Sequence, residues 1–355
     1  MNARIVVGSC YGDEGKGTIV ARLSKNTPNL LNVLTNGGAQ RAHSILTKDG
    51  GFTFQHFGSG TYYGADNYFS RFYILNPMQF AKEYETLFTK PKNIYVDFWC
   101  RFTTPYDMMA NNIMEEALKR KASCRMGIWN TVKRYKETDA PTFWEFMASA
   151  NKEQHLAFVK AYYEKFLDIP DSWKPVWNNP TIVSHYISDC AFMVEKTKFA
   201  SFDTMGATYN DFVFENGQGL LLCDKGVDTS DTTPSHTGSL YAKLLVNDLG
   251  VEINTTIHYV TRPYLTRHGD GDMENGCNQS LFGNKKYEDR TNTYNDAQGN
   301  FRIGELDMAK LKERISLDAE YIPFVLEVTH CDEMDREVEF KKNFENVNFY
   351  ETPIV

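Results

Sequence analysis

Short runs of apolar residues divide the chain into predicted strands and helices. Five runs rich in branched and aromatic residues, each followed by glycine or polar residues, predict buried strands at 4–7, 31–34, 93–100, 211–215 and 323–328. Four further segments carry apolar residues at helical spacing, and these predict helices at 17–24, 106–120, 141–167 and 305–315.

This alternation of strands and helices predicts an α/β fold with a mostly parallel central sheet flanked by helices. No internal repeat, low-complexity tract or flexible linker interrupts the sequence. We therefore expect one domain over residues 1–355, with a helical insertion around 105–200. Ligands of such sheets bind at the carboxyl ends of strands, so the polar and glycine-rich loops after the strands are the candidate sites.

The composition excludes several classes of protein. The 355 residues include 46 acidic and 38 basic ones, and the net charge of -8 argues against binding to nucleic acid or to an anionic membrane. There is no run of 18 apolar residues, and the opening MNARIVV predicts a strand rather than a signal peptide. Seven scattered cysteines without a C-x-x-C pair indicate free thiols in a reducing cytoplasm and argue against structural zinc.

The most informative loop is GSCYGDEGKGT at 8–18. Its glycines follow a predicted strand and precede a predicted helix, which is typical of a phosphate-binding loop. It is not the standard P-loop, because Cys10 stands where that motif has its first glycine and Gly17 follows Lys16. Asp13 and Glu14 lie inside it, which favours a metal ligand or a general base beside the phosphates. A dinucleotide-binding dehydrogenase is excluded, since no G-x-G-x-x-G follows the first strand.

Four other loops carry polar groups that can do chemistry. They are NGGAQRAHS at 36–44 with His43, FENGQG at 214–219, the Thr- and Ser-rich stretch 226–238, and TRHGDGD at 266–272 with Arg267. His43 can serve as a proton donor, and an arginine between flexible residues suits a substrate clamp. Each of these loops alone is also consistent with a structural turn.

Taken together and in this order, the loops resemble adenylosuccinate synthetases. YGDEGKG at 11–17 is similar to the family's WGDEGKG, and NGGAQRAHS to RGGxNAGHT. QHFGSG at 55–60, FENGQG, TRHGDGDME at 266–274 and VTHCD at 328–332 resemble the family's HLxPSG, FEGAQG, TRVGxGPFPTE and TKLD. The resemblance runs from residue 5 to about 332. It implies that family's fold, related to P-loop proteins, and a ligase that phosphorylates O6 of a purine 5'-monophosphate and replaces the phosphate with L-aspartate.

The resemblance also implies roles for particular residues. Asp13 matches the base that removes the purine N1 proton and binds Mg²⁺, and the Ala42 carbonyl matches a second magnesium ligand. Lys16 matches the lysine on the transferring phosphate, His43 the acid at O6, and Gln218 a contact to the purine monophosphate. The implied nucleotide- and phosphate-binding residues are Gly12, Glu14, Gly15, Gly17, Thr18, Gly38, Ser123, Arg134, Thr232 and Asp332. The implied aspartate-binding residues are Arg267, Asn295 and Arg302.

Departures from the family pattern bear on the substrates. The family's arginine-rich aspartate loop is reduced here to Arg302, and its donor-site lysine is replaced by His330, which favours ATP or dATP over GTP. With the compact chain, these features favour the phage branch of 2-aminoadenylosuccinate synthetases, which use dGMP. Asp13 opposes this, because many of those enzymes carry a small hydroxyl residue there. IMP with GTP remains the alternative, and a catalytically inactive nucleotide-binding protein is a second. The resemblance implies a cytoplasmic homodimer, with Arg134 as the candidate to cross into the neighbouring site.

Overall fold

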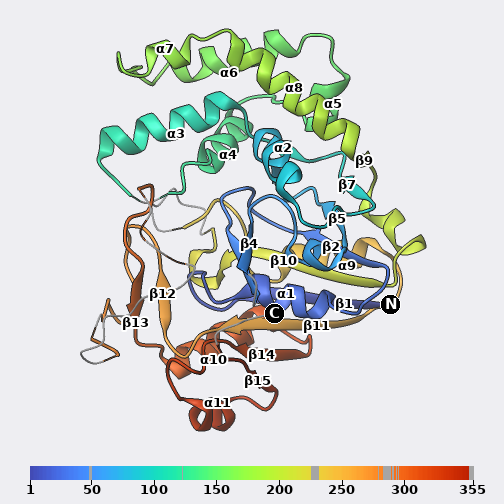
Figure 1. Ribbon diagram of the computed structural model, residues 1–355, viewed down its shortest axis with the longest axis vertical. Coiled ribbons are helices and arrows are strands. Elements are labelled where there is room, and N and C mark those ends of the chain that lie inside the picture. The colour runs from blue at the N-terminus through green and yellow to red at the C-terminus, as the bar shows by residue number, and fades with distance from the viewer. Residues whose placement is uncertain are drawn as a thin grey trace.

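The computed structural model describes residues 1–47, 50–121, 123–224, 232–278, 280–282, 289, 292, 294 and 296–351. Within these residues the centre of the molecule is a nine-stranded, fully parallel sheet (Figure 1). In spatial order its strands are β15 (Val347–Phe349), β14 (Phe324–Val328), β11 (Asn254–Thr261), β1 (Asn2–Gly8), β10 (Asp211–Gly219), β2 (Leu30–Leu34), β5 (Asp66–Phe69), β7 (Ile94–Val96) and β9 (Lys198–Phe199). The predicted α/β fold class is confirmed.

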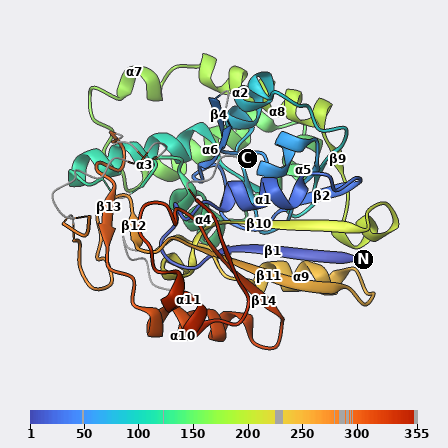
Figure 2. The same cartoon turned by 60° about the horizontal axis from the view of Figure 1, so that its bottom comes forward.

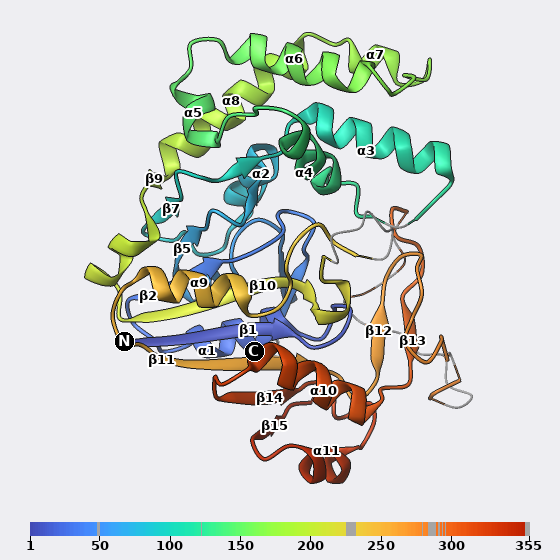
Figure 3. The same ribbon diagram turned by 180° about the vertical axis from the view of Figure 1, so that it is seen from behind.

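The central strand β1 is buried on both faces, as expected for a parallel sheet covered by helices. Alternate residues Ala3, Ile5 and Val7 join the core that includes α9 (Leu240–Asp248) and α10 (Met308–Ala319). Val6 points the other way and packs with α1 (Lys16–Ser24). Figures 2 and 3 show α1 on one side of the sheet and α9 and α10 on the other. Helix α11 (Glu337–Asn343) lies beside β15.

A separate group of helices covers the β5–β9 side of the sheet, at the top of Figure 1. Its members are α2 (Pro77–Thr86), α3 (Pro105–Leu118), α4 (Ile128–Glu137), α5 (Phe143–Ala148), α6 (Lys152–Glu164), α7 (Lys174–Trp177) and α8 (Thr181–Lys196). The region predicted to be helical at 141–167 is helical, but it is interrupted. It is two helices, since α5 ends before Ser149 and α6 begins after Asn151.

Strand lengths also differ from the predictions. The run 93–100 forms a strand only over β7, because Asp97 turns the chain: its carboxylate accepts from the Trp99 N–H at 2.9 Å and its carbonyl from the Cys100 N–H at 3.1 Å. Strand β10, in contrast, continues four residues beyond the predicted 211–215, through Asn216 to Gly219. This extension carries Gln218 to the edge of the sheet where the first glycine-rich loop lies.

Small sheets and short 3₁₀ helices complete the description. The pairs are β3 (His43–Thr47) with β4 (Gly50–Phe54), β12 (Leu265–Arg267) with β13 (Arg302–Gly304), both antiparallel, and β6 (Ile74–Leu75) with β8 (Arg101–Phe102). The 3₁₀ helices are η1 (Ser59–Tyr63), η2 (Phe202–Ala207) and η3 (Leu220–Leu222). In the part of the chain described, no helix has the length and apolar content needed to cross a bilayer.

Candidate active site

A cavity of about 320 Å³ opens beside the loops that follow β1, β10 and β14. It brings together ten residues that the sequence resemblance assigned to the site. They are Gly12, Asp13, Glu14, Gly15, Lys16, Gly17, Thr18, Ala42, His43 and Gln218. Residues that are far apart in the sequence meet here because the carboxyl ends of neighbouring parallel strands lie along one edge of a sheet.

The first loop is built around Glu14. Its Oε1 accepts hydrogen bonds from the Cys10 N–H at 3.0 Å and the Gly12 N–H at 2.9 Å, and its Oε2 lies 2.7 Å from Lys16 Nζ. Both charged side chains are almost fully buried. Gly12 and Gly15 have φ values of 119° and 95°, which favour glycine. Glu14 therefore holds the loop together and balances the charge of Lys16.

Asp13 is fixed from two sides. Its backbone has a φ of 62°, its carbonyl accepts from Arg262 Nε at 2.8 Å, and its Oδ2 lies 3.0 Å from His268 Nδ1. Burial by itself raises the pKa of Asp13, but the hydrogen bond and charge of His268, with the charges of Arg262 and Lys16, outweigh it. The net pKa is below the ordinary value, so Asp13 is an ionised carboxylate at neutral pH.

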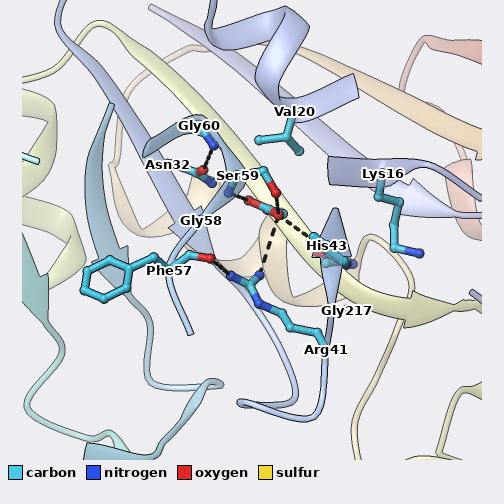
Figure 4. Close-up of polar contacts among 12 residues, drawn as sticks. Lys16, Val20, Asn32, Arg41, His43, Phe57, Gly58, Ser59, Gly60 and Gly217 are labelled. Atoms are coloured by element: carbon cyan, nitrogen blue, oxygen red, sulfur yellow. Dashed lines mark hydrogen bonds and ion pairs between the residues drawn. The ribbon is translucent and has the colours of Figure 1, made fainter. Parts of the chain in front are cut away.

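His43 is the first residue of the β3–β4 hairpin, and its ring is held by a buried carboxylate (Figure 4). Its Nδ1 lies 2.6 Å from Glu215 Oε1. Glu215 also accepts from the Ser59 N–H at 2.8 Å and the Ser59 hydroxyl at 2.6 Å, and Arg41 Nη1 lies 3.8 Å away. Burial raises the pKa of Glu215, but Arg41, His43 and Ser59 together lower it to about 2. Burial lowers the pKa of His43, against the opposing effect of Glu215.

Two buried amides mark where a ligand would bind. Gln218, whose φ is 56°, and Gln40 both line the cavity. Within the described part of the structure, Gln218 Oε1 and both side-chain amide atoms of Gln40 are buried without a hydrogen-bond partner. Because buried polar groups are nearly always hydrogen-bonded, these atoms fit a site that a polar ligand completes.

The structure does not bring every expected residue to the cavity. Those outside its lining are Gly38, Ser123, Arg134, Thr232, Arg267, Arg302 and Asp332. Arg267 lies over the ring of Tyr11, with 4.8 Å from its guanidinium carbon to the ring centroid. Arg302 donates to the carbonyl of Gly269, and the carbonyl of Thr232 accepts from Trp129. Asn295 lies outside the described residues.

Arg134 is the clearest correction. Its side chain is fully buried, with Nε 2.8 Å from Asp107 Oδ1 and Nη2 2.9 Å from Asp107 Oδ2. The guanidinium also donates to the Phe102 carbonyl at 3.1 Å. An arginine held in this way reaches neither a phosphate in the cavity nor a second subunit. The expectation failed because the ion-pair partner, 27 residues earlier in the chain, is not evident from the sequence.

Four other site residues were missed. Arg41, Arg262 and His268 line the cavity, and Glu215 supports it from behind. His330, which the resemblance placed at the donor site, also lines the cavity. Burial and the charge of Arg262 lower the pKa of His330 to about 2, so this imidazole is neutral. Three of the missed residues, Arg41, His268 and Glu215, stood within segments that carried the family resemblance, where their charged or titratable type was the available signal. Arg262 follows β11, where no glycine-rich loop marks the position.

The donor atoms fit magnesium better than a transition metal. The Asp13 carboxylate and the Ala42 backbone both line the cavity, and carboxylate and carbonyl oxygens are the hard ligands that Mg²⁺ prefers. In the described ranges no three His, Cys, Asp or Glu residues are grouped as a metal site. Mg²⁺ usually takes one or two protein ligands and completes its shell with water and substrate phosphates, so two oxygens are sufficient.

Comparisons with known proteins agree with the geometry. Adenylosuccinate synthetase from Lactobacillus acidophilus is 25% identical over 290 residues, covering 76% of this chain but only 64% of the relative. Adenylosuccinate synthetase from Halothermothrix orenii is 23% identical over 346 residues, covering 90% of this chain and 75% of the relative. This chain therefore spans under two thirds of the length of the first of these relatives.

Two solved structures share the fold. Fully ligated adenylosuccinate synthetase from Plasmodium falciparum superposes with a TM-score of 0.73 and 16% identity, covering 95% of this chain and 78% of that one. Succinoaminodeoxyadenylate synthetase from cyanophage S-2L, bound to dGMP and to dATP as an energy donor, superposes with a TM-score of 0.68 and 13% identity. That match covers 99% of this chain and 91% of the cyanophage chain. The family model of adenylosuccinate synthetases matches residues 5–341, and the chain belongs to this family.

Proposed function

We propose that this protein is a ligase that joins L-aspartate to the 6-position of a 6-oxopurine nucleoside 5'-monophosphate, using a nucleoside triphosphate. The observation that carries the proposal is the meeting of Asp13, Lys16 and His43 in one cavity at the strand ends. These are a base, a phosphate-binding cation and an acid, and the reaction needs all three. Membership of the family supports the same assignment.

The first step activates O6 of the purine. The ionised carboxylate of Asp13 removes the N1 proton, which places negative charge on O6. O6 then attacks the γ-phosphorus and the nucleoside diphosphate leaves. Lys16 exchanges its contact with Glu14 for the transferring phosphoryl group and stabilises its charge. When bound by Asp13 and the carbonyl of Ala42, Mg²⁺ supplies Lewis-acid stabilisation of the phosphates.

The second step replaces the 6-phosphoryl group. The amine of aspartate attacks C6, the C6–O6 bond breaks, and inorganic phosphate leaves. His43 supports the charge on O6 during both steps. Because Glu215 stays ionised and accepts from Nδ1, a proton taken up by His43 resides on Nε2, and the carboxylate stabilises the resulting imidazolium.

The favoured monophosphate is dGMP, with ATP or dATP as donor. Support comes from the cyanophage structure, bound to dGMP and dATP, which covers 99% of this chain. His330 at the cavity also favours a donor other than GTP, since a neutral imidazole stands where the resemblance expects a lysine. The second candidate is IMP with GTP. It is favoured by Asp13, which lines the cavity where a small hydroxyl residue would leave room for a 2-amino group.

One assay panel tests these proposals. Purified protein, Mg²⁺ and L-aspartate are incubated with dGMP or IMP, each with ATP, dATP or GTP, and products are identified by mass. We expect a succinyl adduct of dGMP that depends on ATP or dATP and is absent with the Asp13→Asn variant. An adduct formed from IMP alone would replace the first candidate with the second. No adduct from either nucleotide, although both bind, would favour an inactive nucleotide-binding protein.

A further inference from the structure

His268 is the side chain that directs the Asp13 carboxylate. It follows β12 directly, its ring packs 5.0 Å from that of Phe301, and its side chain is 12% exposed. Its Nδ1 lies 3.0 Å from Asp13 Oδ2. An ionised carboxylate only accepts hydrogen bonds, so Nδ1 carries the hydrogen. The backbone of Asp13 is held separately, by Arg262, which leaves the side-chain direction to His268.

We infer that His268 is a positioning residue that orients the base and ties it to the segment around Arg302. The inference rests on the proposed function for its kinetic consequence. The link to that segment is direct: Phe301 contacts the imidazole, Gly269 donates to the carbonyl of Gln298 at 3.0 Å, and Arg302 donates to the carbonyl of Gly269. The ring centroid of Phe301 also lies 5.6 Å from the guanidinium carbon of Arg262, which holds the backbone of Asp13. Movement of this segment, where the sequence resemblance implies aspartate binding, therefore reaches the Asp13 carboxylate through His268 and the Asp13 backbone through Arg262.

Three substitutions of His268 separate the hydrogen bond from the bulk of the ring. In H268N the Asn Nδ2 occupies nearly the place of Nδ1 and preserves the donor. In H268Q the donor is displaced toward the place of Nε2, and H268L removes it. Loss of a residue that orients a reacting group typically costs about 10- to 100-fold. We expect kcat to fall by roughly that factor in H268Q and H268L and to be largely recovered in H268N.

The Michaelis constants distinguish positioning from substrate binding. We expect KM for the purine monophosphate to change much less than kcat, because the effect is on the orientation of the base. The matched control is His258→Leu. His258 also forms a buried imidazole–carboxylate pair, with Nδ1 2.7 Å from Glu327 Oε1, but it lies outside the cavity lining. If His268→Leu kept wild-type kcat, or if H268N were as slow as H268L, the inference would be wrong.

A second measurement does not depend on turnover. In protein labelled with ¹⁵N-histidine, the resonances of His268 are identified by their loss in H268N. We expect the Nδ1 resonance of His268 to shift in Asp13→Asn, while that of His258 does not. An unshifted resonance would overturn the contact even in an active enzyme. If the wild-type protein formed no adduct, the proposed function would fail, and the spectra would still decide whether His268 holds Asp13.

Discussion

Replacing Arg134 with methionine should destabilise the protein without altering its chemistry. Asp107 and Arg134 are both fully buried and form a two-pronged ion pair between α3 and α4. Asp107 also accepts from the Tyr163 hydroxyl at 2.6 Å and the Thr104 N–H at 2.7 Å. Arg134→Met keeps the length of the side chain and removes its charge and donors, leaving a carboxylate buried without its cation.

The size of the loss in stability follows from the Asp107 carboxylate that remains buried without its cation. Two of the hydrogen bonds to Asp107, at 2.8 and 2.9 Å, disappear, and the charge that they balanced cannot reach solvent. Breaking a buried pair on one side costs about 3–5 kcal/mol. We therefore expect the free energy of unfolding of Arg134→Met to fall by about 3–5 kcal/mol. The double variant with Asp107→Asn should lose less than Arg134→Met alone, because it leaves no unpaired charge.

The assay is urea unfolding at pH 7, followed by fluorescence and circular dichroism. If Arg134→Met does not fold, Arg134→Lys keeps the charge with less complete geometry, and we expect an intermediate loss of stability. Ligand binding and kcat should stay close to wild type wherever the variant is folded. A loss below about 1 kcal/mol would refute the reasoning, since surface pairs contribute that little. So would a large fall in kcat at unchanged stability, which would return Arg134 to the active site.

Three further predictions concern the cavity and the group of helices α2–α8. Asp13→Ala should abolish nearly all adduct formation with its unfolding midpoint unchanged, and retention of most activity would show that Asp13 is not the base. His43→Ala should lower kcat more than it raises KM, and an effect confined to KM would leave His43 only a binding role. Burial and the charge of Arg134 lower the pKa of His155 from 6.5 to about 4. The unfolded chain therefore takes up a proton first, and stability should fall as the pH drops from 6.5 to 4. Urea midpoints at pH 7 and pH 5 test this: His155→Gln should reduce the decrease, and an identical decrease would contradict the assignment.

Much of the structure of the first glycine-rich loop was predictable because its causes are local. Glycines after an apolar run require positive φ values, and Gly12 and Gly15 have them. Helix α1 begins at Lys16, one residue before the predicted 17, so the lysine lies at the helix start. Residues 31–34 and 323–328 likewise became β2 and β14 with small changes at their ends. In each case neighbouring residues determine the structure.

The remainder depends on contacts between distant segments. Glu215 lies 172 residues from His43, and His268 lies 255 residues from Asp13. Nothing in the sequence around Glu215, which lies in the central sheet, indicates that its partner is a histidine on the β3–β4 hairpin. The same limit explains Arg134, whose type and position suit a phosphate contact until Asp107 is placed beside it. Fold class follows from periodicity, whereas the partner of a charged side chain follows from topology.

The strand order has a consequence for the synthesis of this protein. β1 is the centre of the sheet, yet its two neighbours are β10 and β11, and Asn2 pairs with Asp211 and Asn254. At about 5–20 residues per second, a ribosome needs roughly 10–50 s to complete those strands after β1 has been made. During that interval an apolar strand with unpaired backbone on both edges is exposed to other chains. The strand order therefore makes the nascent chain prone to aggregation until β10 and β11 have been synthesised.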